Sequence, residues 1–273
     1  MIIEKRLDYE IYDETKPTAF IPLIKEIFKL EGFNYIYRGQ GFDRPLAPKI
    51  SRDDEYLESN RGIIPRNKSS SDNEEIDLIT EKEHIALNEL KRRIPLLRNS
   101  ELNLDYERPE SLWNVFIIAQ HYGLQTRLLD FSYNPLVAAF FASNSHPNDD
   151  GVIWCIDADT DNYRVLEQLY SIDYTGIIED GESYLFLPPF LDIRIRVQQS
   201  VLVYFTDPYT PLESQKSFLN STNPHPLVRI KIPHNFKHNL LNHLHQVGID
   251  NESLFPDISG SMAHLDWLLK KVN

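Results

Sequence analysis

The stretch from Ala119 to Ser132, AQHYGLQTRLLDFS, predicts a helix end, a tight turn and a strand in succession. The helix is expected to begin at Pro109 and to end at Gly123, since proline suits the first turn of a helix and glycine its C-terminal cap. The strand is expected over Thr126–Leu129. The positions i, i+3, i+4 and i+7 of one helix face are occupied by Trp113, Phe116, Ile117 and Gln120. The polar side chain of Gln120 is therefore expected to point inward.

Further helices and strands are predicted on both sides of this stretch. Asn134–Ala142 opens with an N-cap residue and a first-turn proline, which predicts a helix. Asn34–Arg38 predicts a short aromatic strand. The remaining strands are expected at 151–156, 194–198 and 227–232, and three of the remaining helices at about 74–93, 234–247 and 261–272. One more helix is expected to follow Pro17, with helical period over 20–28 and Gly32 at its C-terminal cap.

The mixed order of these elements predicts the α+β class. We expect a single domain over residues 1–273, built on a mixed, strongly bent β-sheet with helices on its flanks. Residues 51–75 contain almost no apolar side chains and include NKSSSDN at 67–73, so they are expected to form a long exposed insertion loop.

Composition excludes several classes of function. The chain has 273 residues, a 41% hydrophobic share and a formal charge of −13, so non-specific binding to nucleic acid or to an anionic membrane is disfavoured. Cys155 is the single cysteine and cannot form an internal disulfide. The longest apolar stretches, 116–119 and 136–142, are far shorter than the ~20 residues that span a bilayer. We therefore expect a cytoplasmic protein without a membrane segment.

Arg38 is the first candidate for a binding residue. It ends a predicted strand and precedes Gly39, and its planar guanidinium suits a phosphate or a carboxylate. The alternative is a buried arginine paired with Glu83 or Asp130.

Glu83 interrupts the apolar stripe of the helix predicted at 74–93. An ionised carboxylate is costly to bury unless an arginine matches it. Its candidate partners are Arg38, Arg127, Arg194 and Arg196.

Two more titratable side chains flank the predicted turn. His121 can serve as acid, base or hydrogen-bond donor, or else as a capping or satisfied core histidine. Asp130 lies at the end of the predicted strand, on the face opposite Arg127, where a carboxylate either organises the turn or takes part in a site. His234 and His238 have the i, i+4 spacing of a metal face, with His243 and His245 beyond them. No glutamate-linked zinc pattern accompanies these histidines, so a solvated helix and no metal site are expected.

Three segments together resemble the FRG domain, a bacterial family named for its aromatic-Arg-Gly motif. They are YRGQ at 37–40, the stretch 119–132 and NPLVAAFFA at 134–142. The segment SLFPD at 253–257, with Gly260, is similar to the end of that family's domain. The resemblance implies an FRG-like fold over nearly the whole chain.

The layout is also similar, more distantly, to the ADP-ribosyltransferase fold. The resemblance places Arg38 at the first-strand arginine, Thr126 or Ser132 at the hydroxyl element, and 136–142 at the following helix. The catalytic glutamate of a later strand is replaced by Gln198-Gln199. Glu83 is a candidate to supply the missing carboxylate.

These observations lead to one expected function and one alternative. We expect a polar cleft that binds a nucleotide such as NAD, with ADP-ribosyl transfer or NAD glycohydrolysis as its chemistry. The alternative is a non-catalytic recognition module, with a protein partner, in a bacterial phage-defence or toxin system. The expected catalytic residues are Glu83, His121 and Asp130, and the expected cofactor-binding residues are Arg38, Gly39, Gln40, Gln120, Thr126, Arg127 and Gln198.

Overall fold

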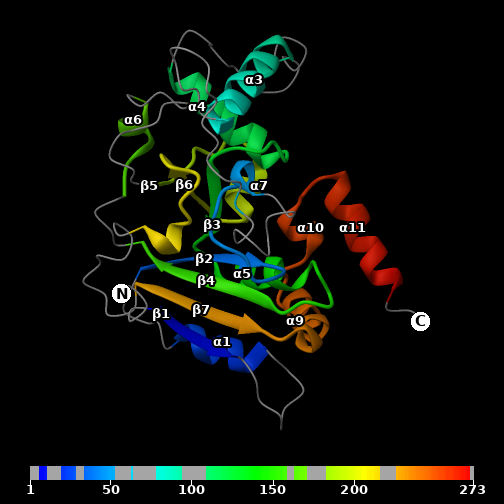
Figure 1. Ribbon diagram of the computed structural model, residues 1–273. Coiled ribbons are helices and arrows are strands. Elements are labelled where there is room, and N and C mark those ends of the chain that lie inside the picture. The colour runs from blue at the N-terminus through cyan, green and yellow to red at the C-terminus, as the bar shows by residue number, and fades with distance from the viewer. Residues whose placement is uncertain are drawn as a thin grey trace.

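The strands form one mixed, seven-stranded sheet in the order β1-β7-β4-β2-β3-β6-β5 (Figure 1). β1 runs parallel to β7, and the other neighbouring pairs are antiparallel. The computed structural model describes residues 6–10, 20–28, 34–52, 63, 78–93, 109–158, 163–170, 183–215 and 226–270. The strands are β1 Arg6–Glu10, β2 Tyr35–Gln40, β3 Leu128–Ser132, β4 Gly151–Asp157, β5 Ser183–Phe186, β6 Ser200–Phe205 and β7 Leu227–Ile232.

Helices of very different length surround the sheet. They are α1 Phe20–Phe28, α3 Leu78–Arg93, α4 Pro109–His121, α5 Pro135–Ser143, α6 Leu166–Leu169, α7 Ile193–Val197, α9 His234–Gln246, α10 Asn251–Leu254 and α11 Ile258–Leu269. Side-chain caps fix several of their first residues. The Asn134 side chain accepts a hydrogen bond from the backbone N–H of Leu136 at 2.9 Å, and Asp192 and Asp257 cap α7 and α11 in the same way.

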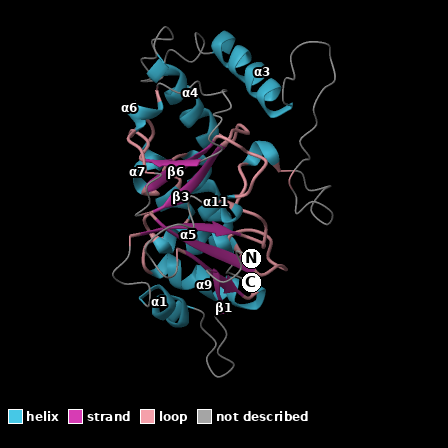
Figure 2. Cartoon of the chain, turned by 60° about the vertical axis from the view of Figure 1, so that its left-hand side comes forward, coloured by secondary structure: helices cyan, strands magenta, loops and turns pink. Residues whose placement is uncertain are grey.

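The sheet bends between β2 and β3. These two strands are paired at one register position, Tyr37 opposite Ser132, whereas β2 pairs with β4 at six positions. In Figure 1, β1, β7, β4 and β2 run across the molecule, while β3 rises toward α3 and α4. Figure 2 shows the same division, with α1 and α9 at one end and α3 and α4 at the other. The bend leaves room for side chains between the two groups of strands.

Alternate side chains of the strands fill different cores. Tyr35 and Tyr37 of β2 belong to the core that α5 and α9 cover. Ile36 of β2 and Trp154 of β4 face the other way and share a core with Val203 of β6, from beyond the bend. A third core lies between α4 and the outer face of β3, β6 and β5. The bent sheet thus wraps a central core, and helices cover both of its outer faces.

The predicted α+β class with a mixed, bent sheet flanked by helices is confirmed. The strand expected at 194–198 is wrong, because Ile193–Val197 is one turn of helix that Asp192 caps. The strands β1, β5 and β6 were not predicted. Most of the expected loop 51–75 lies outside the described residues, which include only 51, 52 and 63 of it, so the loop and the domain extent 1–273 stay predictions. No helix within the described ranges has both the length and the apolar composition needed to cross a membrane.

Candidate functional site

A cavity of about 230 Å³ lies at the bend of the sheet, where β2 and β3 meet. The ends of α4 and α5, the helix α7 and the loop after α10 complete its wall. Its polar lining consists of Tyr37, Arg38, Gln120, His121, Asp130, Ser132, Arg194, Gln198 and Ser200. Its other lining residues are Gly39, Phe131, Val137, Ala138, Phe141 and Phe255. Five of the polar residues expected in a cleft, Arg38, Gln120, His121, Asp130 and Gln198, are therefore brought together.

Arg38 reaches this cavity from β2. Its Nη1 donates a hydrogen bond to the backbone carbonyl of Asp130 at 2.5 Å, which fixes the guanidinium across the bend. Its Nε is buried and has no hydrogen-bond acceptor among the described residues. Burial lowers the pKa of Arg38 to about 10, an effect that the Asp130 carboxylate opposes, so the side chain remains a cation at neutral pH. Arg38 was expected either to bind a ligand or to pair with the carboxylate of Glu83 or Asp130. The structure shows a hydrogen bond from Arg38 to Asp130, but the acceptor is the main-chain carbonyl.

His121 is the last residue of α4 and brings an imidazole to the same cavity. Its side chain is only 10% exposed, and its Nε2 makes no hydrogen bond to any described residue. The nearest ionised partner is Asp192, whose Oδ1 lies 3.8 Å from Nε2, beyond hydrogen-bond distance. Burial lowers the pKa of His121, while the carboxylates of Asp130 and Asp192 act in the opposite direction. The ring is therefore neutral at neutral pH.

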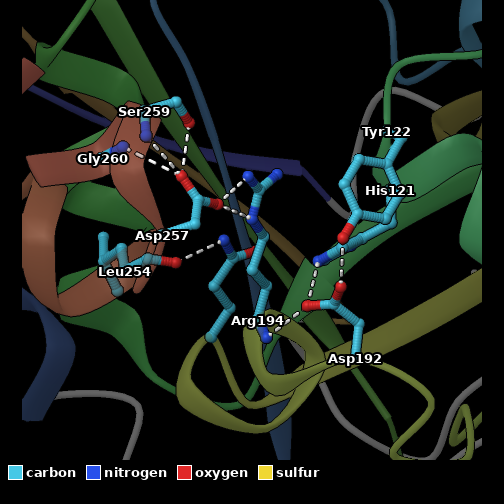
Figure 3. A network of polar contacts seen from close by, with 9 residues as sticks. His121, Tyr122, Asp192, Arg194, Leu254, Asp257, Ser259 and Gly260 are labelled. Atoms are coloured by element: carbon cyan, nitrogen blue, oxygen red, sulfur yellow. Dashed lines mark hydrogen bonds and ion pairs between the residues drawn. The ribbon is translucent and has the colours of Figure 1, made fainter. Parts of the chain in front are cut away.

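Asp192 fixes the relative position of α4 and α7 (Figure 3). Its Oδ1 accepts the backbone N–H of Arg194 at 2.8 Å, and its Oδ2 accepts the hydroxyl of Tyr122 at 2.7 Å. Burial raises the pKa of Asp192, but these two hydrogen bonds together with nearby positive charge, including that of Arg194, hold the pKa below its usual value. The carboxylate that faces His121 therefore stays ionised.

Arg194 of α7 (Figure 3) and Gln198, the residue that follows α7, connect this helix to the C-terminal helices. They lie four residues apart, so both point to the same side of the helical turn. Nε of Arg194 donates to Oδ2 of Asp257 at 2.8 Å, and its Nη2 contacts the same oxygen. Nε2 of Gln198 donates to the carbonyl of Leu254 at 2.9 Å. The segment between α10 and α11 is thereby held at the cavity, where Phe255 forms part of the wall.

The far wall of the cavity is apolar and aromatic. Phe141 of α5 and Phe255 meet edge to face, with their ring centroids 6.0 Å apart. Val137 and Ala138 continue this wall along α5. The cavity thus combines a fixed cation with an aromatic surface.

Gly39 allows α5 to lie directly on β2. A Cβ atom at this position would come within 1.8 Å of the carbonyl oxygen of Ala138. Gly39 was expected to bind a cofactor, and the structure shows that the close neighbour of this residue is helix α5. Gly39 nevertheless contributes to the cavity wall.

Glu83 and Arg127 form a buried ion pair away from the cavity. Nε of Arg127 donates to both carboxylate oxygens of Glu83, at 2.8 and 3.0 Å, and Nη2 contacts Oε2. Both side chains are 0% exposed. Arg127 is thus the partner of Glu83 among the four arginines considered. The structure places Glu83, expected as a catalytic residue, and Arg127, expected as a binding residue, in the interior.

Gln40 and Thr126 also lie behind the cavity rather than in its lining. Oε1 of Gln40 accepts a hydrogen bond from Nε1 of Trp154 at 3.2 Å. The hydroxyl of Thr126 donates to Oε1 of Gln120, which turns the amide nitrogen of Gln120 away from Thr126. Thr126 therefore positions a lining residue instead of lining the cavity itself.

Arg194, Phe141, Phe255 and Ser200 line the cavity but were not predicted as site residues. The sequence carried one usable signal for Arg194. Asp192 stands two residues before it, as an N-cap would, and predicts a helical turn that brings Arg194 and Gln198 to one face.

A family model described as the FRG domain matches residues 33–151. The match includes the cavity residues from β2, α4, β3 and α5, and it ends before the segment 253–257 that also resembles the family. No curated protein and no solved structure matches the chain, and the resemblance to ADP-ribosyltransferases stays a prediction. The predicted FRG domain is confirmed over residues 33–151, and its extension over nearly the whole chain stays a prediction.

Proposed function

We propose that the cavity binds an NAD-like nucleotide and that Arg38 holds one of its phosphates. One observation carries this proposal: two buried nitrogens, Nε of Arg38 and Nε2 of His121, lack a hydrogen-bond partner among the described residues and belong to the same cavity. Nε of Arg38 is a donor, and a buried donor without an acceptor costs about 1–3 kcal/mol. A ligand with oxygen acceptors removes that cost, and a phosphate also matches the charge of the guanidinium.

The size of the cavity limits what enters it. Its volume of about 230 Å³ lies just below the ~300–1,000 Å³ of ordinary ligand pockets. One nucleoside phosphate end therefore fits, and the rest of a dinucleotide extends outside. The aromatic wall of Phe141 and Phe255 suits the ring of such a ligand.

The same arrangement supports cleavage of the bond between nicotinamide and ribose. Asp130 is the one acidic residue of the lining, and its carboxylate stabilises positive charge that develops on the ribose. The bond to nicotinamide breaks, and its electron pair leaves with the neutral base. The oxygen of water then bonds to the anomeric carbon, and its proton passes to the neutral imidazole of His121. With another nucleophile in place of water, the reaction is ADP-ribosyl transfer.

Calorimetric titration with NAD tests the binding. We expect Arg38→Ala to weaken binding by about 10–150-fold, which corresponds to the ~1.5–3 kcal/mol of a charge-assisted hydrogen bond. Arg196→Ala is the matched control, because Arg196 is exposed on α7 and does not line the cavity. Absence of heat with the unmodified protein refutes the proposal, and equal affinity of the Arg38 and Arg196 variants refutes the role of Arg38.

Release of nicotinamide tests the chemistry separately. Asp130→Asn and His121→Gln are expected to keep NAD affinity within about tenfold and to lose the release of nicotinamide. If both variants release it at the unmodified rate, neither residue takes part in the reaction.

A second candidate function is recognition of the nucleotide without catalysis. The position of Glu83 favours this function. Glu83 was considered as the substitute for the missing strand glutamate, but its carboxylate is buried in an ion pair with Arg127. On this reading the domain senses a nucleotide for a protein partner in a cytoplasmic phage-defence or toxin system. Binding of NAD without any release of nicotinamide by the unmodified protein distinguishes this function from the first.

A further inference from the structure

Two histidines and an aspartate gather on the C-terminal helices, away from the cavity residues already described. They are His245 in the last turn of α9, Asp250 before α10 and His264 within α11. One potential ligand atom from each lies within 4.8 Å of the others. Oδ2 of Asp250 is 3.0 Å from Nδ1 of His245 and 3.8 Å from Nδ1 of His264.

His264 is the member of this cluster whose position needs an explanation. Its side chain is only 10% exposed, and its buried Nδ1 makes no hydrogen bond to any described residue. At 3.8 Å the Asp250 oxygen is too far to accept one. A buried ring nitrogen is therefore directed toward a carboxylate and a second imidazole without bonding to either.

The surrounding contacts hold the three side chains in place. Oδ1 of Asp250 accepts the backbone N–H of Ser253 at 2.9 Å, which leaves Oδ2 directed toward the two histidines. The ring of Trp267 lies 4.7 Å from the ring centroid of His245 and 5.8 Å from that of His264. His245 is the most exposed of the three, at 32%, and provides the side from which solvent reaches the cluster.

We propose that His245, Asp250 and His264 bind a divalent metal ion of the zinc class. Two imidazole nitrogens and one carboxylate oxygen are a donor set that zinc accepts, with bonds of ~2.0–2.2 Å. Two ligands of one ion lie at most about twice that length apart, so the observed separations need only small side-chain movements. Three protein ligands leave one position for water on the exposed side.

The sequence did not predict this site. No metal was expected because no glutamate-linked zinc pattern accompanies His234 and His238. In the structure both residues are exposed on α9. The cluster uses histidines 19 positions apart, His245 of α9 and His264 of α11, which come together only in the folded chain.

The ion would join three helices whose connecting segment borders the cavity. α10 ends at Leu254, and Phe255 follows in the cavity wall. Since the metal binds the folded arrangement and not the separated helices, it stabilises the C-terminal helices by mass action. This role is independent of the nucleotide, so either proposal can fail while the other holds.

Titration of the metal-free full-length protein with Co²⁺ and Zn²⁺ tests the site. We expect one Co²⁺ per chain with visible absorption bands of a low-coordinate ion, displacement of Co²⁺ by Zn²⁺, and a higher melting temperature with Zn²⁺. Asp250→Asn retains an N-cap side chain but not the carboxylate, and we expect it and His245→Gln to bind at least ~100-fold more weakly. His238→Gln, on the exposed side of α9, is the control and should bind as the unmodified protein does.

Two outcomes overturn the proposal. The first is the absence of stoichiometric binding and of any thermal stabilisation in the unmodified protein. The second is equal binding by Asp250→Asn, His245→Gln and His238→Gln, which would mean that the ion attaches to surface histidines. The Zn²⁺ dependence of the unmodified protein's melting temperature remains decisive if a variant fails to fold.

Discussion

The buried pair of Glu83 and Arg127 supports a quantitative prediction of stability. Both side chains are 0% exposed, and three nitrogen–oxygen contacts join them. Glu83→Gln keeps the size and a carbonyl acceptor but removes the negative charge. The buried guanidinium of Arg127 then loses the negative charge of Glu83.

The expected loss follows from the cost of an uncompensated buried charge. Breaking such a pair by removing one partner costs about 3–5 kcal/mol in the free energy of unfolding. A chain of this length loses about 2–4 °C of melting temperature per kcal/mol, so Glu83→Gln should melt about 6–20 °C lower. Thermal melts followed by circular dichroism, together with urea unfolding, measure both quantities.

A double variant separates the effect of charge from that of packing. When apolar side chains of similar volume replace both members, as in Glu83→Met with Arg127→Met, both charges of the pair are removed and most of the lost stability should return. NAD affinity of Glu83→Gln should be unchanged at temperatures where it is folded, because Glu83 does not line the cavity. A melting temperature equal to that of the unmodified protein, or loss of NAD binding without loss of stability, would refute this interpretation of Glu83.

Two further predictions concern helix packing and acid sensitivity. Gly39→Ala should destabilise the fold by more than about 3 kcal/mol, because the new methyl group would lie 1.8 Å from the backbone oxygen of Ala138. Gly123→Ala should cost only about 1–2 kcal/mol, because Gly123 has a φ of +98° but open space around it. Urea unfolding that ranks the two variants in reverse would contradict the packing of α5 on β2. Hydrogen bonds from the Ser259 hydroxyl and from Arg194 hold the pKa of Asp257 below its usual value. The ionised carboxylate therefore stabilises the fold at any pH above its unfolded-state pKa of about 4, and this stabilisation is lost as the pH falls toward the folded-state pKa. Asp257→Asn should therefore melt lower than the unmodified protein at pH 7, with the difference shrinking below about pH 4, and a difference that does not change with pH would show that the charge of Asp257 is unimportant.

Local signals were sufficient to predict the elements that bring most polar residues to the cavity. The helix end and turn after His121, the strand with Asp130 and the Asn134 cap each depend on a few neighbouring residues, and the structure contains all three. Period-two alternation over 194–198 failed, because five residues are too few to distinguish a strand from one turn of helix. The cap at Asp192 was the signal that decides between them.

Tertiary partners could not be derived from local patterns. Glu83 had four candidate arginines, and the structure pairs it with Arg127, the residue before β3, which meets Glu83 of α3 in the interior. The role of Gly39 likewise depends on α5, which lies about one hundred residues further along the chain. Such pairings depend on packing between elements distant in the sequence, which a short motif does not encode.

Nε of Arg38 lacks an acceptor among the described residues, and we propose that a bound nucleotide provides one. The NMR signal of the Arg38 Nε–H group reports directly whether this hydrogen bond forms. The signal is assigned by its disappearance in Arg38→Lys, and that of Arg127, already bonded to Glu83, serves as the internal reference. On titration with NAD we predict a saturable shift of the Arg38 signal, while the Arg127 signal stays in place. An Arg38 signal that does not move while NAD binds, or no response of any signal at saturating NAD, would contradict the account.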